Sequence, residues 1–188
     1  MANVTAMEPQ VLVDLLALNL EHSQLVTLPQ DQCSITVISP WLTDMELALH
    51  PSGHHASLGS KDNAQSMRLS EALRWFCRQG WRVNIAVLRY GESFCGLRKD
   101  PALFSREVYV LRSLLAVGAN IFLCPGLHAK GIVTPLGVVT GTTNYTHSGL
   151  HLQMQNAYYF SFNNQEFSKT RAQLLAFLQP EWRSVTVP

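Results

Sequence analysis

Apolar segments of two different periodicities alternate along this chain, and this alternation constrains its fold more than any other feature. Short runs rich in β-branched residues are typical of buried strands, whereas apolar residues spaced three and four apart are typical of amphipathic helices. Strands are predicted over Ser34–Ser39, Arg82–Leu88, Asn120–Cys124, Leu127–Thr134, Gly137–Thr140 and Ala157–Phe162. Helices are predicted over residues 8–21, from Leu69 to a stop at Gly80, from Phe104 to a stop at Gly118, and over Phe167–Leu178.

The order of these segments predicts an α/β fold. Helices and strands alternate as far as Cys124, and a run of strands with a closing helix follows. Such an order favours a mixed β-sheet with helices on both faces. With 188 residues the chain is long enough for a substantial core, so we expect residues 1–188 to form a single domain. A short helix over Asp44–Leu49 is expected to interrupt the polar stretch of residues 43–67.

The net charge of +1 argues against a protein that grips long stretches of nucleic acid, because such proteins are strongly basic. Any phosphate binding is therefore expected to be local. The four cysteines form no C-x-x-C pair, so no metal site and no cofactor is expected, and free thiols indicate a reducing, cytoplasmic compartment. We expect no membrane span, because no segment is long and apolar enough.

The segment Leu127–Val133 carries the most informative pair of polar residues. Residues two apart in a strand share a face, so His128 and Lys130 are expected to project together, with their neighbours facing the opposite layer. An ammonium beside an imidazole favours the unprotonated ring, which keeps a nitrogen available as a nucleophile. The same ammonium would hold an anionic phosphate against that nitrogen.

A second polar element follows the next predicted strand. Gly141 permits close approach of the backbone, while Thr142 and Asn144 supply a hydroxyl and an amide that can donate to phosphate oxygens. Taken alone, an H-x-K pair is more often an ordinary part of the core, and a Gly-Thr-Thr-Asn stretch is more often an ordinary turn. Their occurrence one strand apart favours a phosphate site instead.

The two elements together resemble the motif of the phospholipase D superfamily, H-x-K-x4-D followed on the next strand by G-S/T-x-N. A weaker resemblance extends to Ile38–Trp41, which is similar to the first core strand, to Gly80–Leu88, and to Ser148–Leu150 after the asparagine. The single H-x-K motif resembles that of small dimeric bacterial endonucleases of this superfamily. A closer resemblance is to the phospholipase-D-like component of bacterial gene clusters that place 7-deazapurines in DNA.

This resemblance implies a phospholipase D-like domain and a metal-independent phosphodiesterase, a nuclease, that works through a covalent phosphohistidine. It implies that His128 is nucleophile or general acid and that Lys130, Thr142 and Asn144 bind phosphate. Gln155 stands where the family has a glutamate that orients the histidine ring. Because the chemistry needs two histidines, the resemblance also implies a homodimer that brings two motifs together. Nucleic acid, DNA rather than RNA, is the implied substrate, and a role in DNA modification or restriction implies partner proteins of a defence system.

Two positions depart from the family pattern. Pro135 stands where the family has an aspartate, and Gln155 is a neutral match to the glutamate, so the electrostatic support for a protonated histidine is expected to be weaker. Tyrosyl-DNA phosphodiesterases of the superfamily also lack the aspartate and are active. The alternative hypothesis is a catalytically weak or inactive module that binds nucleic acid or a partner protein. A phospholipase is least favoured, because lipid-hydrolysing members carry two motifs in a longer chain.

Two aromatic residues, Trp41 and Tyr90, follow predicted strand ends. Bases of a nucleic acid could stack on aromatic rings in such positions. Packing at the rim of the domain is the more common role of such residues, and the sequence leaves both interpretations open.

Overall fold

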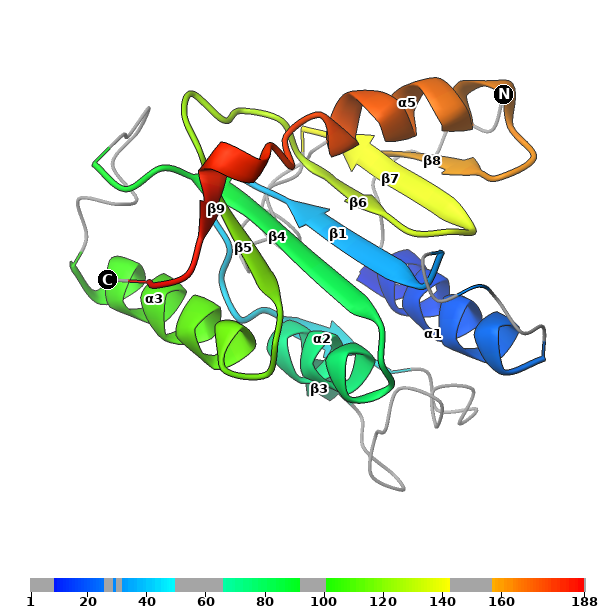
Figure 1. Ribbon diagram of the computed structural model, residues 1–188. Helices are drawn as coiled ribbons and strands as arrows, with labels where there is room; N and C mark the ends of the chain where they lie inside the picture. The colour runs from blue at the N-terminus through cyan, green and yellow to red at the C-terminus, as the bar shows by residue number, and fades with distance from the viewer. Residues whose placement is uncertain are drawn as a thin grey trace.

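The computed structural model describes residues 9–25, 29, 32–49, 66–91, 101–142 and 157–187 of the chain. A mixed sheet of seven strands, ordered β8-β7-β6-β1-β4-β5-β9, forms its centre (Figure 1). The strands are β1 (Ser34–Ile38), β4 (Arg82–Leu88), β5 (Asn120–Cys124), β6 (Gly131–Val133), β7 (Gly137–Gly141), β8 (Ala157–Ser161) and β9 (Arg183–Ser184). A separate two-stranded sheet pairs β2 (Glu46–Ala48) with β3 (Ser66–Arg68).

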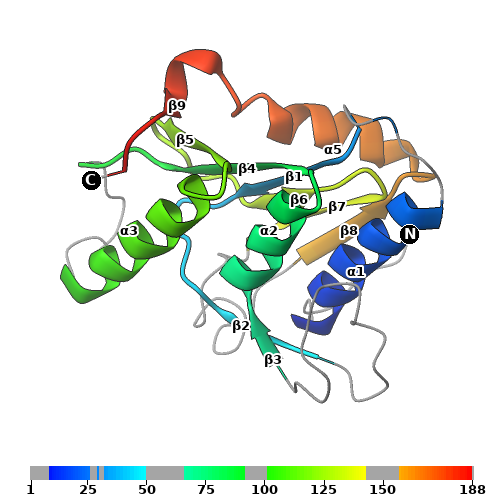
Figure 2. The same cartoon turned by 60° about the horizontal axis from the view of Figure 1, so that its bottom comes forward.

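Helices cover both faces of the large sheet, which confirms the fold class predicted from the sequence. The helices α1 (Pro9–Leu25), α2 (Leu69–Arg78) and α3 (Pro101–Leu115) lie on one face, and α5 (Gln165–Leu175) lies on the other (Figure 2). A 3₁₀ turn, η3 (Pro180–Trp182), leads from α5 to the edge strand β9. In the part of the chain that the structure describes, every helix is too short or too polar to cross a bilayer.

Strand directions divide the sheet into two parts that meet between β1 and β6. The strands β1, β4 and β5 run parallel to one another. The strand β6 pairs antiparallel with both of its neighbours, so that Gly131 lies opposite Ile38 of β1 and opposite Thr140 of β7. The C-terminal ends of β1, β4, β5 and β7 and the start of β6 therefore lie at one end of the sheet, called the carboxyl end below.

The core has two layers, one on each side of the sheet. Strand residues alternate between the layers with a period of two. The layer facing α1, α2 and α3 includes the fully buried side chains of Leu12, Leu16, Ile35, Leu73, Phe76, Ile85, Leu111, Ile121 and Ile132. The layer facing α5 contains Ile38, Ala86, Leu88, Phe122, Cys124, Leu127, Val133, Val138 and Leu174.

The short helix predicted over Asp44–Leu49 is wrong, because this segment contains strand β2. Met45, Leu47 and Leu49 are buried, whereas Glu46 is exposed. This alternation is the period-two pattern of a strand. Glu46 pairs with Arg68 of β3, a residue far along the chain. Pairing with a distant strand thus overrides the helical preference of the local sequence.

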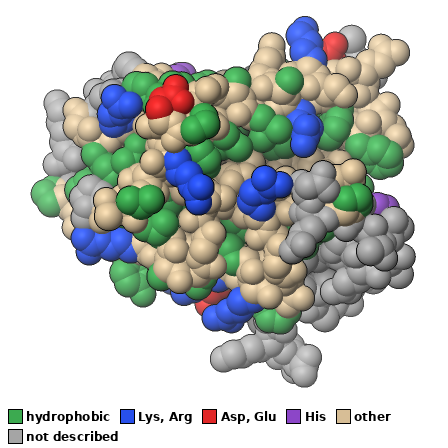
Figure 3. Space-filling model, viewed as in Figure 1, with side chains coloured by type: hydrophobic (Ala, Val, Ile, Leu, Met, Phe, Trp, Pro, Cys, Tyr) green, Lys and Arg blue, Asp and Glu red, His purple; other side chains and the backbone are tan. Residues whose placement is uncertain are grey.

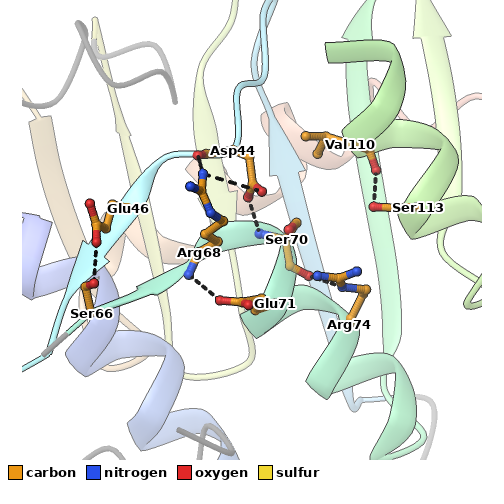
Figure 4. A network of polar contacts seen from close by, with 9 residues as sticks. All are labelled: Asp44, Glu46, Ser66, Arg68, Ser70, Glu71, Arg74, Val110 and Ser113. Carbon is orange, nitrogen blue, oxygen red and sulfur yellow. Dashed lines mark hydrogen bonds and ion pairs between the residues drawn. The ribbon is translucent and has the colours of Figure 1, made fainter. Parts of the chain in front are cut away.

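Asp44 connects the segment before β2 to the start of α2 (Figure 4). Its Oδ1 accepts a hydrogen bond from the backbone N–H of Ser70 at 3.0 Å, and its Oδ2 lies 4.0 Å from Nη1 of Arg68. Glu71 accepts from the backbone N–H of Arg68 at 2.8 Å. Two carboxylates therefore satisfy backbone donors at the N-terminus of α2, where a helix leaves such groups unpaired. The contacts of Asp44 also hold the chain after β1 against this helix.

A buried amide ties α1 to the turn between β6 and β7. Asn19, which is 1% exposed, donates from Nδ2 to Oγ1 of Thr134 at 3.1 Å, and its Oδ1 accepts from the N–H of Leu136 at 3.2 Å. Thr134 Oγ1 in turn donates to the carbonyl oxygen of Gly137 at 2.9 Å. This network fixes the end of β6 that is opposite to the carboxyl end of the sheet.

Replacing this amide tests the network. Asn19→Ala is expected to lower the free energy of unfolding by about 1–3 kcal/mol, because it removes the three hydrogen bonds of a buried side chain, to Leu15, Thr134 and Leu136. The matched control is Leu18→Ala, at a neighbouring position that is 50% exposed, and it should change stability by less than about 0.5 kcal/mol. Urea denaturation followed by circular dichroism measures both values, and equal effects would contradict the role given to Asn19.

Candidate active site

His128 and Lys130 lie at the carboxyl end of the sheet, in the segment that enters β6. Pro125 and Gly126 turn the chain directly after β5. Gly126 has a φ of 62°, a left-handed conformation that glycine adopts without the strain of a side chain. This turn allows the chain to leave β5 and return along β6.

Alternate residues of this segment face opposite layers, as the sequence predicted, although β6 begins only at Gly131 and not at Leu127. Leu127 and Ala129 pack in the layer that faces α5. A Cβ on Gly131 would stand 2.6 Å from a methyl group of Leu174 in α5, so this position faces the same layer. By the same alternation, Lys130 falls on the side of α1, α2 and α3.

The two polar side chains differ in exposure and are linked through the backbone. Lys130 is 6% exposed, whereas His128 is exposed. Lys130 Nζ donates to the carbonyl oxygen of His128 at 2.7 Å, and the Lys130 carbonyl oxygen accepts from Oγ1 of Thr140 at 2.9 Å. The field of a charge is screened less at a buried position than in water. The imidazole of His128 is therefore accessible, and the ammonium of the adjacent Lys130 is only weakly screened by solvent.

The end of β7 brings the second polar element beside this lysine. Thr140 pairs with Gly131, so continuing the antiparallel register sets Gly141 opposite Lys130. Gly141 has a φ of 154°, a conformation that residues with a side chain rarely adopt. A glycine thus fits the last position of β7, opposite Lys130.

Three of the five site residues predicted from the sequence are described, and they lie at the same end of the sheet. His128 and Lys130 precede β6, and the exposed Thr142 follows β7. Asn144 and Gln155 lie outside the described residues. The two described donors, an ammonium and a hydroxyl, are suited to bind the oxygens of a phosphate group next to the imidazole.

Pro135, at the position of the family's aspartate, lies at the opposite end of β6 from His128. It belongs to the turn that joins β6 to β7, whereas His128 precedes β6. At the rise of a strand, the chain between the two positions spans on the order of 20 Å. A carboxylate at this position would be out of reach of the His128 ring in the same chain. The expectation that Pro135 removes electrostatic support from this histidine is therefore wrong.

The two aromatic residues that follow strand ends are poorly placed for stacking against bases. Tyr90 meets Phe104 of α3 edge-on, with ring centroids 5.7 Å apart. Trp41 is only 7% exposed. Tyr90 is therefore a packing residue, and the burial of Trp41 leaves no open ring face on which a base could stack.

Cys124, at the end of β5, is a weak candidate for a nucleophile. Burial raises the pKa of its thiol to about 12, although the nearby Arg89 acts in the opposite direction. The thiol therefore stays protonated at neutral pH and lacks the reactive thiolate form. Within the described ranges, no group of three His, Cys, Asp or Glu side chains could hold a metal ion. His128 therefore remains the candidate nucleophile at this end of the sheet.

Two buried polar residues at the carboxyl end, Ser39 and Glu107, were not predicted from the sequence. Ser39 Oγ donates to the carbonyl oxygen of Trp41 at 2.5 Å. Glu107, which is 3% exposed on α3, accepts from the N–H of Leu42 at 3.2 Å through Oε1. Leu42 and Glu107 are 65 positions apart, so no local pattern could have revealed this contact.

Two solved structures are similar to this chain over most of its length. Nuc, a phospholipase D family member from Salmonella typhimurium, aligns with a TM-score of 0.55 at 13% identity and covers 91% of this chain and 88% of that chain. NucT from Helicobacter pylori aligns with a TM-score of 0.49 at 11% identity and covers 93% and 91%. No protein-family model and no curated protein matches the sequence. The likeness to Nuc shows that this chain has a phospholipase D-like fold.

The position of Pro135 leads to a binding test. Pro135→Asp is expected to leave the affinity for inorganic sulfate within about twofold, because charges farther apart than a Debye length of ~10 Å are largely screened. Lys130→Ala should weaken sulfate binding by about tenfold and Thr142→Ala by less, because charge-assisted hydrogen bonds are roughly twice as strong as neutral ones. Isothermal titration calorimetry measures all three. A large change for Pro135→Asp, or none for Lys130→Ala, would contradict this account of the site.

Proposed function

We propose that this protein is a metal-independent phosphodiesterase that cleaves nucleic acid, DNA rather than RNA, through a phosphohistidine intermediate. One observation carries the proposal: the exposed imidazole of His128 lies beside the buried ammonium of Lys130, at the carboxyl end of a phospholipase D-like sheet. A nitrogen nucleophile can attack phosphorus when a fixed positive charge binds the phosphate oxygens and stabilises the charge that develops.

The proposed reaction has two balanced steps. A ring nitrogen of His128 attacks phosphorus, and the P–O bond to the leaving group breaks as a second histidine gives a proton to the departing oxygen. Water then loses a proton to the second histidine and attacks the phosphohistidine, which breaks the P–N bond and frees the ring. Lys130, Thr142 and Asn144 bind the non-bridging oxygens throughout, and Gln155 orients the ring of His128.

We propose that the second histidine is His128 of the partner subunit in a homodimer. A two-fold axis passing near the carboxyl end would by symmetry bring two identical motifs face to face. The exposure of His128 supports this arrangement, because the ring is accessible to a second chain. The chain contributes one H-x-K motif to a mechanism that needs two histidines.

We further propose a role in DNA modification or restriction, in the cytoplasm and together with partner proteins of a defence system. The resemblance to the phospholipase-D-like component of 7-deazapurine gene clusters supports this role. Lys and Arg side chains are scattered over the face seen in Figure 3 and do not form a continuous stripe. With a net charge of +1, the chain is suited to contact few phosphates by itself, so a partner that holds the DNA fits this role.

The catalytic proposal is tested by cleavage without metal. In excess EDTA the protein is expected to cut plasmid or single-stranded DNA, and His128→Ala should lower the rate by more than about 10³-fold, because it removes both nucleophile and acid. The control is His22→Ala, which lies one turn along α1 from Asn19 and thus near the opposite end of β6. Gel electrophoresis measures both rates, and cleavage that survives His128→Ala would refute the assignment.

The shared site is tested by mixing subunits. If each site needs a histidine from both chains, an equal mixture of parent protein and His128→Ala should retain about one quarter of the activity after subunit exchange, because only parent homodimers are complete. Independent sites would retain about half. Light scattering at micromolar concentration should give the mass of a dimer. A monomer, or activity proportional to the parent fraction, would argue against the shared site.

A second candidate function is a module that binds nucleic acid or a partner protein with little catalysis. The neutral Gln155 at the position of the family's glutamate favours it. Binding of DNA that Lys130→Ala weakens, with no cleavage in EDTA or with added divalent cations, would select this function over the first.

A further inference from the structure

The segment Ser39–Leu42, which follows β1, lies beside the His128–Lys130 segment at the carboxyl end of the sheet. Ile38 is the last residue of β1 and lies opposite Gly131, the first residue of β6. The chain leaving β1 and the chain entering β6 therefore occupy adjacent positions beyond the ends of two paired strands. A ligand bound at His128 and Lys130 would therefore lie near this segment.

Hydrogen bonds hold the backbone of this segment on both sides. The N–H of Ser39 donates to the Ala86 carbonyl oxygen at 3.0 Å, and the N–H of Leu88 donates to the Pro40 carbonyl oxygen at 3.3 Å. Further along, Oγ of Ser39 donates to the Trp41 carbonyl oxygen at 2.5 Å. Glu107 then accepts from the next N–H, that of Leu42, at 3.2 Å. The conformation around Trp41 is therefore fixed by contacts to β4 and α3.

One polar group of this segment, the indole N–H of Trp41, lacks a hydrogen-bond acceptor among the described residues. The indole Nε1 of Trp41 is buried and has no hydrogen-bond partner among the described residues, although the side chain is only 7% exposed. A buried donor without an acceptor is costly, and such groups are rare in native structures. Trp41 is one of the buried apolar residues of the core, so its ring is packed while its N–H lacks an acceptor. The indole N–H of Trp41 is therefore a donor on a fixed backbone segment that lacks an acceptor among the described residues.

We propose that the indole N–H of Trp41 donates a hydrogen bond to a phosphate oxygen of the bound phosphodiester and so completes the site on the side of β1. This inference rests on the phosphodiester-binding role proposed above for His128 and Lys130. The ammonium of Lys130 attracts the anion, and a neutral, fixed N–H orients the bound phosphate without adding charge. Trp41 is thus a binding residue of the site, and Glu107 positions it through Leu42.

Nuclear magnetic resonance gives a direct readout of this hydrogen bond. The chain has four tryptophans, so ¹⁵N-labelled protein gives four indole N–H signals, and Trp41→Phe identifies one of them by its loss. Inorganic phosphate is the probe, added at constant ionic strength. The Trp41 signal is expected to move most of the four, with a midpoint equal to that of the backbone signals around Lys130. The Trp41 signal staying in place while the Lys130 region responds would overturn the inference.

Affinity and stability together separate binding from a structural role. Trp41→Phe should weaken phosphate binding by about tenfold, the loss expected for one hydrogen bond to a charged acceptor. Without phosphate its melting temperature should fall less than that of Trp81→Phe, because losing the unpaired donor offsets part of the cost of the cavity. Trp81→Phe is the matched control: Trp81 is 6% exposed and packs on Phe76 with ring centroids 5.0 Å apart, at the start of β4 and thus at the other end of the sheet. It should lose stability and keep its affinity for phosphate.

An isosteric replacement controls for the loss of ring volume in Trp41→Phe. Incorporation of 3-benzothienylalanine at position 41 exchanges the N–H for sulfur and keeps the bicyclic ring. The expected result is the same loss of phosphate affinity with unchanged stability. Full affinity in this variant would refute the role of the N–H. If neither the parent protein nor any variant binds phosphate, the phosphodiester-binding role fails and this inference fails with it. If phosphate binds and only Lys130→Ala weakens it, that role stands and the inference alone fails.

Discussion

The antiparallel pairing of β6 with β1 is the constraint on which the rest of this arrangement depends. Because β1, β4 and β5 are parallel, their C-terminal ends share one end of the sheet, and β6 must begin at that end to pair with β1 as it does. The chain between β5 and β6 is consequently confined to a short segment at the carboxyl end. This segment contains His128 and Lys130, and its neighbours are the ends of β1 and β7.

The late start of β6 has a chemical consequence for the site. Residues 127–130 are outside the strand ladder, so the carbonyl oxygen of His128 accepts from the ammonium of Lys130. A lysine that is 6% exposed needs such acceptors, because burying a charge without hydrogen bonds is costly. Had the ladder continued to Leu127, strand partners would have competed for these carbonyl groups. The irregular segment therefore allows a buried positive charge beside an exposed imidazole.

Local patterns predicted the central strands well and the peripheral ones poorly. The bounds of β4 and β5 agree with the predicted Arg82–Leu88 and Asn120–Cys124, because each is an apolar run that is buried in both layers and preceded by a glycine that ends a helix. The segment that contains β2 was wrongly predicted to be a helix, and β3 and β9 were not predicted. Strands of two or three residues are too short to show a period, and the partner strand decides their conformation.

The sequence by itself determined the alternation of helices and strands, the two-layer core, and the spacing that puts His128 and Lys130 at alternate positions of one segment. These features depend on residue type and on spacing within a few positions, which local sequence contains. Only the tertiary structure decided that Pro135 stands at the far end of β6 from His128, that Glu107 accepts from the N–H of Leu42, and that the indole N–H of Trp41 is buried without a hydrogen-bond partner among the described residues. Each of these facts depends on which strand ends meet and on contacts between residues far apart in the chain. Those contacts are set by the packing of the whole sheet, and no local pattern records them.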